Sequence, residues 1–140
     1  IVNNVIGKPG RFFGSSTGAG APDVHYAAGP WKLEPHQALI IEGKFPSDDE
    51  CVFANVLLLN KFMQSLDYQH GRSQHFNRKQ LKDYGKDGSY KMVLSHENPG
   101  KEYNWLDTEG RANGIVFYRY FLNTAVLEQV KTHVINFNDL

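Results

Sequence analysis

The sequence contains a single cysteine, Cys51, among 140 residues. One cysteine cannot form a disulfide within the chain, and no Cys-x-x-Cys pair or Cys/His cluster has the spacing of zinc ligands. His70 and His75 are five residues apart, which fits neither a His-x-His pair on a strand nor two histidines one helical turn apart. We therefore expect no metal and no cofactor, and we interpret Cys51 as a small apolar residue of the core.

The chain also lacks a long hydrophobic run and an excess of charge of either sign. Its densest apolar stretch, residues 54–59, is far shorter than the roughly 20 residues of a membrane-spanning helix. Fifteen lysines and arginines balance fifteen aspartates and glutamates, so no basic field would attract nucleic acid or an anionic membrane. With 41% hydrophobic residues, the chain is expected to form one globular domain without a nucleic-acid partner or a membrane span.

The first residue is Ile1 rather than methionine, and the start has neither the basic region nor the apolar segment of a signal peptide. We interpret the chain as a processed or trimmed product. Its localisation and source organism are left open by the sequence.

Glycine and proline are concentrated in the first third of the chain. Residues 1–37 are accordingly predicted to form a loop-rich arm that wraps the core, and residues 38–140 a β-sandwich core. The arm lacks the Lys-Ser/Thr pair of a phosphate-binding loop and any Gly-x-Gly-x-x-Gly motif, so a flexible loop is favoured. Its aromatic residues Phe12, Phe13 and Trp31 are candidates for exposed docking contacts.

Short β-type runs separated by turn signals follow the arm. Five runs are β-branched, aromatic or alternating: residues 38–43, 52–59, 89–96, 115–122 and 132–137. Asp87-Gly88 and Asn113-Gly114 are hairpin-type turns before two of them, and residues 125–130 could be one helical turn or a linker. The pattern predicts a mainly all-β fold, an antiparallel two-layer β-sandwich of jelly-roll type with few short helices. A flattened barrel is the alternative.

One arginine lies in an otherwise apolar and aromatic strand. Period-two alternation places Arg119 on the same face as Phe117 and Phe121, with two tyrosines on the other face. A guanidinium among apolar neighbours needs a carboxylate or carbonyl partner. Arg119 is therefore predicted either to tie down a loop through an acid such as Asp67 or Asp107, or to hold an anionic ligand.

A polar segment between two predicted strands gathers chemically versatile side chains. Asp67, Tyr68 and His70 lie within four residues, and Gly71 would permit the turn that brings them together. They are candidate ligand-binding residues, and solvated loop positions are the alternative interpretation.

Residues 104–110 form a second polar segment. Trp105 offers a large flat apolar face, while Asn104 and Asp107 offer hydrogen bonds, as in sugar-binding loops. In the alternative, Trp105 plugs one end of the sandwich and the two polar residues cap turns. The sequence has no nucleophile elbow and no triad spacing, so it leaves the catalytic residues open. In an enzyme, His70, Asp67 and Arg119 would be the acid-base and anion-holding groups.

Four motifs occur in an order that is typical of a known family: Ser65-Leu66-Asp67-Tyr68, Asp87-Gly88-Ser89, Asn98-Pro99-Gly100 and Asn104-Trp105-Leu106-Asp107-Thr108-x-Gly110. Tyr26, Leu33, residues 38–43 and Arg119 fit the same pattern, so the likeness covers roughly residues 24–122. The chain resembles the domain of unknown function 1214 family. The resemblance implies a jelly-roll-like β-sandwich, usually the C-terminal part of a longer bacterial protein and sometimes preceded by domain of unknown function 1254. It implies no activity and no catalytic residues.

Three functions are compatible with these observations. The favoured one is a non-catalytic binding or accessory module for a small polar molecule or saccharide. Its candidate residues are Asp67, Tyr68, His70, Asn104, Trp105, Asp107 and Arg119. The second is an enzyme, or the substrate-facing part of one completed by a missing N-terminal domain. The third is a structural or oligomerisation domain, whose partner is a second copy or an upstream domain of the same precursor.

Overall fold

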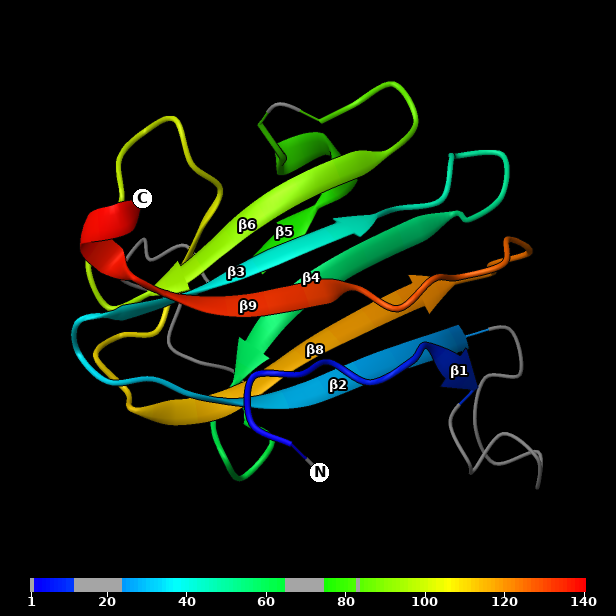
Figure 1. Cartoon of the computed structure of the whole chain (residues 1–140). Coiled ribbons are helices and arrows are strands. Elements are labelled where there is room, and N and C mark those ends of the chain that lie inside the picture. The colour runs from blue at the N-terminus through cyan, green and yellow to red at the C-terminus, as the bar shows by residue number, and fades with distance from the viewer. Residues whose placement is uncertain (1, 12–23, 65–74, 83) are drawn as a thin grey trace.

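The computed structural model describes residues 2–11, 24–64, 75–82 and 84–140, which form two facing β-sheets (Figure 1). The five-stranded sheet contains, in spatial order, β1 (Gly10–Arg11), β2 (Val24–Lys32), β8 (Asn113–Phe121), β4 (Phe53–Leu59) and β5 (His75–Asn77). The four-stranded sheet contains β7 (Trp105–Asp107), β6 (Ser89–Ser95), β3 (Gln37–Lys44) and β9 (Lys131–Asn136). The helices of the described residues are two 3-10 turns, η2 (Arg78–Gln80) and η3 (Phe137–Asp139). The predicted two-layer all-β sandwich with few short helices is confirmed.

One strand pair departs from the antiparallel prediction. β7 runs parallel to β6, with Val93 opposite Trp105 and Ser95 opposite Asp107. The other strand pairs of the described residues are antiparallel. The direction of β7 follows from the connection over residues 96–104, which returns along the sheet before β7 begins instead of turning back in a hairpin.

Alternation along β8 divides its side chains between the core and the outer surface. Val116, Tyr118 and Tyr120 are at most 1% exposed, while Phe117 and Arg119 between them are half-buried on the other face. β6 follows the same rule, because its alternate residues 90, 92 and 94 lie in the main core cluster. The predicted facing of β8 is therefore confirmed.

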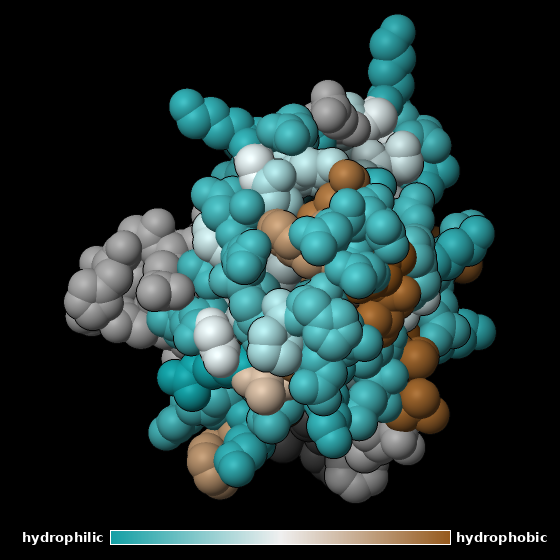
Figure 2. Space-filling model, turned by 60° about the vertical axis from the view of Figure 1, so that its left-hand side comes forward, coloured by the Kyte–Doolittle hydropathy of each residue, from teal (hydrophilic) through white to brown (hydrophobic). Residues whose placement is uncertain are grey.

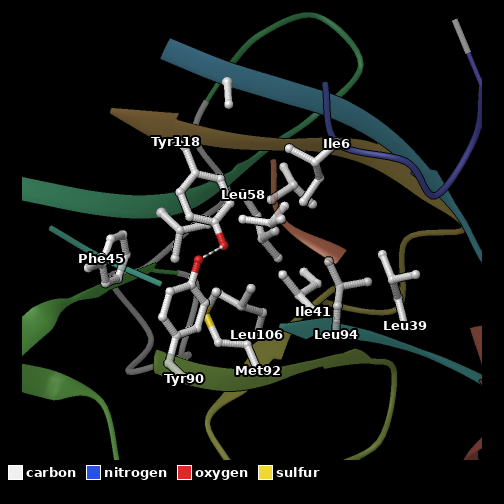
Figure 3. Close-up of a cluster of buried hydrophobic side chains, with 14 of the residues drawn as sticks. Ile6, Leu39, Ile41, Phe45, Leu58, Tyr90, Met92, Leu94, Leu106 and Tyr118 are labelled. Carbon is white, nitrogen blue, oxygen red and sulfur yellow. Dashed lines mark hydrogen bonds between the residues drawn. The ribbon is translucent and has the colours of Figure 1, made fainter. Parts of the chain in front are cut away.

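In the core between the sheets, Phe45, Tyr90 and Tyr118 lie together beside a group of aliphatic side chains (Figure 3). The hydroxyls of Tyr90 and Tyr118 point toward each other across the two layers and lie 2.6 Å apart. Phe45 stacks on Tyr90 with ring centres 4.7 Å apart. The hydroxyls of Tyr90 and Tyr118 bond each other inside the core and so avoid most of the cost of burying them.

Cys51, predicted as a core residue, is 1% exposed, and its Sγ lies 3.2 Å from the carbonyl oxygens of Phe53 and Phe121.

The predicted loop-rich arm, residues 1–37, contains the two-residue strand β1 and the nine-residue strand β2, so regular structure begins well before Ala38. Pro30 is tolerated in β2 because its missing N–H does not interrupt the ladder to β8. Its carbonyl accepts from the Asn4 amide, so the side of Pro30 on which an N–H would lie faces residues 4–7. Trp31, predicted as an exposed docking residue, is 0% exposed and lies in the core. Phe12 and Phe13 lie outside the described residues.

Residues 4–7 close the open side of the sandwich between β2 and β9. The amide of Gly7 donates to the Ala28 carbonyl of β2 at 2.9 Å. From the other sheet, Thr132 Oγ1 donates to the Asn4 carbonyl at 2.5 Å. Ile6 is 1% exposed and belongs to the main core. The segment therefore contributes a core side chain as well as covering an edge.

A smaller hydrophobic cluster covers the outer face of the four-stranded sheet. Ala38, Ile40 and Val93 are buried there beneath Tyr103 of the β6–β7 connection and Phe137 of η3. This packing explains why the chain end folds back over the sheet in Figure 1. On the five-stranded sheet, the outer face carries the half-buried rings of Phe117 and Phe121 and the exposed ring of Phe53.

Candidate binding cleft

Asn104, a predicted ligand-binding residue, is 5% exposed and bonded to the backbone. Its Oδ1 accepts from the Lys82 amide at 2.7 Å, and its Nδ2 donates to the carbonyls of Lys82 and Lys91 at 3.0 and 2.9 Å. The side chain thus joins the segment before β6 to the sheet. These bonds agree with a structural role for Asn104.

The turn after β7 also satisfies its own polar groups. Trp105 is half-buried, and its Nε1 donates to the Ser95 carbonyl at 3.1 Å. Asp107 is 3% exposed, and its Oδ1 accepts from the Glu109 amide at 2.8 Å. Thr108 Oγ1 and His96 Nδ1 lie 2.6 Å apart. Figure 2 brings this end of the sandwich toward the viewer, and its surface is mostly hydrophilic with a narrow hydrophobic band along one side.

Arg119 lies in the other sheet, so the structure does not bring it together with the turn after β7. Its Nε donates to Oδ1 of Asn55 at 3.2 Å. Among the described residues no carboxylate pairs with it, so a tie to Asp107 is not what holds it. The other candidate residues, Asp67, Tyr68 and His70, lie outside the described part of the chain.

A hollow among the described residues lies at the opposite end of the sandwich, lined by the segments that follow β3 and precede β6 and β9. Figure 1 shows these strand ends. This end cleft has a volume of about 640 Å³. Four segments line it: Lys44, Phe45, Pro46, Ser47, Asp48 and Glu50; Lys79; Tyr84, Gly85, Lys86, Asp87 and Gly88; and Ala125, Val126, Leu127 and Glu128. A shallower hollow shares Lys44 and Glu128 with it and continues toward β9.

Two capped turns shape the end cleft. In the turn after β3, Ser47 Oγ donates to the Glu50 carboxylate at 3.1 Å, and the Glu50 amide donates to the Ser47 carbonyl. In the turn before β6, Gly88 has a φ of +90°, and its carbonyl accepts from the Phe45 amide at 2.9 Å. Glycine is needed at this position, because a side chain there would be strained and would meet the Phe45 carbonyl. The bond between the two turns fixes their separation.

The lining of the end cleft carries charges of both signs. Three lysines face four carboxylates: Lys44, Lys79 and Lys86, and Asp48, Glu50, Asp87 and Glu128. Lys44 Nζ lies 3.9 Å from Asp87 Oδ2 in an exposed pair. Hydrogen bonds from Ser89, helped by the Lys44 charge, hold the pKa of Asp87 below its ordinary value. The carboxylates can accept hydrogen bonds and the ammonium groups can donate them at neutral pH.

The base of the end cleft continues into the aromatic core. Phe45 lines the cleft and packs against Tyr90, Tyr118 and Tyr120. Burial raises the pKa of all three tyrosines well above the ordinary value of a phenol. They are therefore neutral near neutral pH and serve as a fixed apolar floor.

The sequence patterns did not identify the end cleft, because its lining comes from four separate segments. The only signal was the pair of turns, Asp87-Gly88 and the acidic turn over residues 46–50. Within the described residues, no three His, Cys, Asp or Glu side chains are grouped as metal ligands would be. None of the described helical elements is long and apolar enough to cross a bilayer.

The structure is similar to two solved structures. An uncharacterised protein from Burkholderia cenocepacia shares 27% sequence identity and superposes with a TM-score of 0.81, over 98% of this chain and 36% of the other. The VPA0106 protein from Vibrio parahaemolyticus shares 16% identity with a TM-score of 0.60, over 86% of this chain and 33% of the other.

The chain therefore spans about a third of the length of each of these proteins. No protein-family model matches the sequence. No curated protein matches it either. The likeness extends over nearly the whole sandwich, and the resemblance to the domain of unknown function 1214 family stays a prediction.

Proposed function

We propose that this domain is a non-catalytic binding module that holds a small polyhydroxylated ligand, such as a saccharide, in the end cleft. The observation that carries the proposal is the cleft itself. Its volume of about 640 Å³ lies within the roughly 300–1,000 Å³ of small-molecule sites. It is formed by turns held on a rigid sandwich, which is where proteins commonly place binding residues.

The balance of charge in the end cleft favours a neutral, hydroxyl-rich ligand. Three lysines and four carboxylates would both attract and repel a ligand of a single charge. A sugar hydroxyl can accept from an ammonium group and donate to a carboxylate at the same time. Tyr84 and Leu127 add apolar surface against which the carbon face of a sugar ring can pack.

The chemistry of the lining supports binding without catalysis. Among the described residues that line the end cleft there is no histidine or cysteine. The tyrosines beneath it are buried and remain protonated, so they do not exchange protons near neutral pH. The cleft can therefore orient a ligand through hydrogen bonds.

The test is a titration of the whole chain with a panel of mono- and oligosaccharides, followed by ¹⁵N-¹H correlation NMR. We expect at least one sugar to shift the amides of residues 84–88 and 125–128 together. A panel that moves neither segment at 20 mM sugar overturns the proposal.

Charge-reversal variants locate the site. Lys86→Glu and Glu128→Lys should each weaken binding of that sugar at least fivefold, because both side chains are exposed and line the end cleft. Lys101→Glu is the matched control, since Lys101 is an exposed lysine of the β6–β7 connection and does not line the cleft. Equal affinity in all three variants would place the sugar elsewhere.

A further inference from the structure

A row of polar side chains crosses the outer face of the five-stranded sheet. Strand register places Tyr26 of β2 opposite Arg119 of β8, Arg119 opposite Asn55 of β4, and Asn55 opposite Asn77 of β5. Directly paired residues of antiparallel strands point to the same face. Because Tyr118 and Tyr120 point into the core, this row lies on the opposite, outer face.

Aromatic pairs lie on both sides of Arg119. The rings of Tyr26 and Phe117 have centres 5.6 Å apart, and those of Phe53 and Phe121 have centres 5.8 Å apart. Phe53 is 39% exposed, and Phe117 and Phe121 are half-buried. The face thus offers flat apolar surface on either side of one cation.

Arg119 is held through its Nε and its guanidinium plane, while its two terminal nitrogens are left to bind a ligand. Its Nε donates to Asn55 Oδ1 at 3.2 Å, and its guanidinium carbon lies 5.6 Å from the centre of the Phe121 ring. Both contacts fix the plane of the guanidinium. Within the described residues its two terminal nitrogens donate no hydrogen bond and no carboxylate balances its charge. A half-buried cation without a counter-charge favours an anion from outside the described chain.

We propose that this outer face binds a carboxylate attached to a ring, with Arg119 as the residue that receives the carboxylate. The two terminal N–H groups form a planar fork that matches the two oxygens of a carboxylate. The flanking aromatic pairs pack against the ring body of the ligand. Acidic sugars and aromatic acids share this chemistry. The site is separate from the end cleft and does not depend on the proposed function.

The test is an NMR titration of the whole chain with D-glucuronate and with phenylacetate. Glucose and 2-phenylethanol, which have the same ring types without a carboxylate, are the controls. We expect one or both carboxylates to shift the amides of Asn55, Phe117 and Phe121, and neither control to do so at 20 mM. Binding of glucuronate alone identifies a sugar acid, and binding of phenylacetate alone identifies an aromatic acid.

Three variants assign the interaction to the guanidinium. Arg119→Gln should weaken carboxylate binding at least tenfold, and Arg119→Lys should recover only part of it, because an ammonium lacks the fork. Arg111→Gln is the control, since Arg111 is exposed, pairs only loosely with Glu109 at 4.0 Å, and lies outside this face. Thermal denaturation of each variant verifies that it is folded.

Several outcomes overturn the proposal. Equal affinity in the Arg119→Gln variant does so, and so does the absence of binding by both carboxylates. Shifts confined to residues 84–88 also overturn it, while they leave the proposed function intact. The remaining alternative is the structural tie predicted from the sequence. This alternative predicts that neither carboxylate binds. It also predicts that Arg119→Gln and Asp67→Asn lower the melting temperature equally, and that the double variant is no less stable than either single variant. That result would show that Arg119 forms a structural ion pair with Asp67.

Discussion

Gly29 permits residues 4–7 to lie directly against β2. A Cβ atom at this position would lie 2.1 Å from the Val5 carbonyl oxygen and 2.7 Å from the Ile6 Cα. Both are backbone atoms, so neither can turn aside as a side chain would. Gly29→Ala should therefore lift the segment off the sheet and withdraw Ile6, which is 1% exposed, from the core.

The expected cost follows from what the lifted segment loses. Truncation of a buried isoleucine to alanine costs about 2–5 kcal/mol. Gly29→Ala displaces the same side chain and also breaks the bonds from the amides of Asn4 and Gly7 to β2. We therefore expect a loss of at least about 2 kcal/mol. Without the contact the sign would be reversed, since alanine is better than glycine in a strand by roughly 0.5–1 kcal/mol.

Urea denaturation of four proteins measures this effect: wild type, Gly29→Ala, Ile6→Ala and the double variant. Because both substitutions remove the same packing, the cost of the double variant should be smaller than the sum by about 1–2 kcal/mol. Gly10→Ala is the control, since a Cβ there meets nothing within 4 Å. The reasoning is refuted if Gly29→Ala is as stable as wild type, or if the two single costs add.

Four further predictions concern the core and the β6–β7 connection. Gly114→Ala would place a Cβ 2.1 Å from the ring of Trp31, which is 0% exposed, so thermal denaturation should show a loss of about 1–3 kcal/mol. Tyr118→Phe leaves the Tyr90 hydroxyl without its partner and should lower the free energy of unfolding in urea by about 1–3 kcal/mol. The double variant Tyr90→Phe/Tyr118→Phe should be closer to wild type in stability, because it leaves no unpaired hydroxyl. Burial raises the pKa of both tyrosines, so the unfolded chain releases their protons first. The contribution of these tyrosines to stability should be fully present below about pH 10 and should be lost as the pH rises further. Each tyrosine can lower the folding constant by up to about tenfold per pH unit. Circular dichroism should show a smaller alkaline loss of stability in the double variant. Asn104→Ala removes the three hydrogen bonds of a buried side chain and should cost at least about 2 kcal/mol, measured by urea denaturation.

The strands that could be predicted are those whose burial follows from their own sequence. Burial alternates strictly along β8 and over the first four residues of β6, and period-two reasoning gave the boundaries of both strands within one or two residues and the facing of Tyr118 and Arg119. β2 could not be predicted in this way. Gly29 and Pro30 lower the strand propensity of the sequence, and their positions are acceptable only because residues 4–7, 22 to 26 residues earlier in the chain, pack there.

The candidate site was harder to predict for a related reason. Asn104 and Asp107 are polar residues that can either cap a turn or bind a ligand, and composition alone does not choose between them. The choice depends on whether a backbone group lies opposite, which is a property of the fold. The end cleft depends even more on the fold, since Lys79, Asp87 and Glu128 come from separate segments of the chain and line one cleft only in the folded structure.

Alternation in β8 also explains how one strand can support two surfaces. Tyr118 and Tyr120 point inward and pack under Phe45 at the floor of the end cleft, while Arg119 between them points outward to the polar row. The backbone ladder to β2 and β4 fixes both sets of side chains, so a change at Arg119 leaves the inner face intact. Substitutions on the two faces share no side-chain contact and should act independently on binding. Coupling between them would require the ladder itself to shift, which the core packed around Tyr118 opposes.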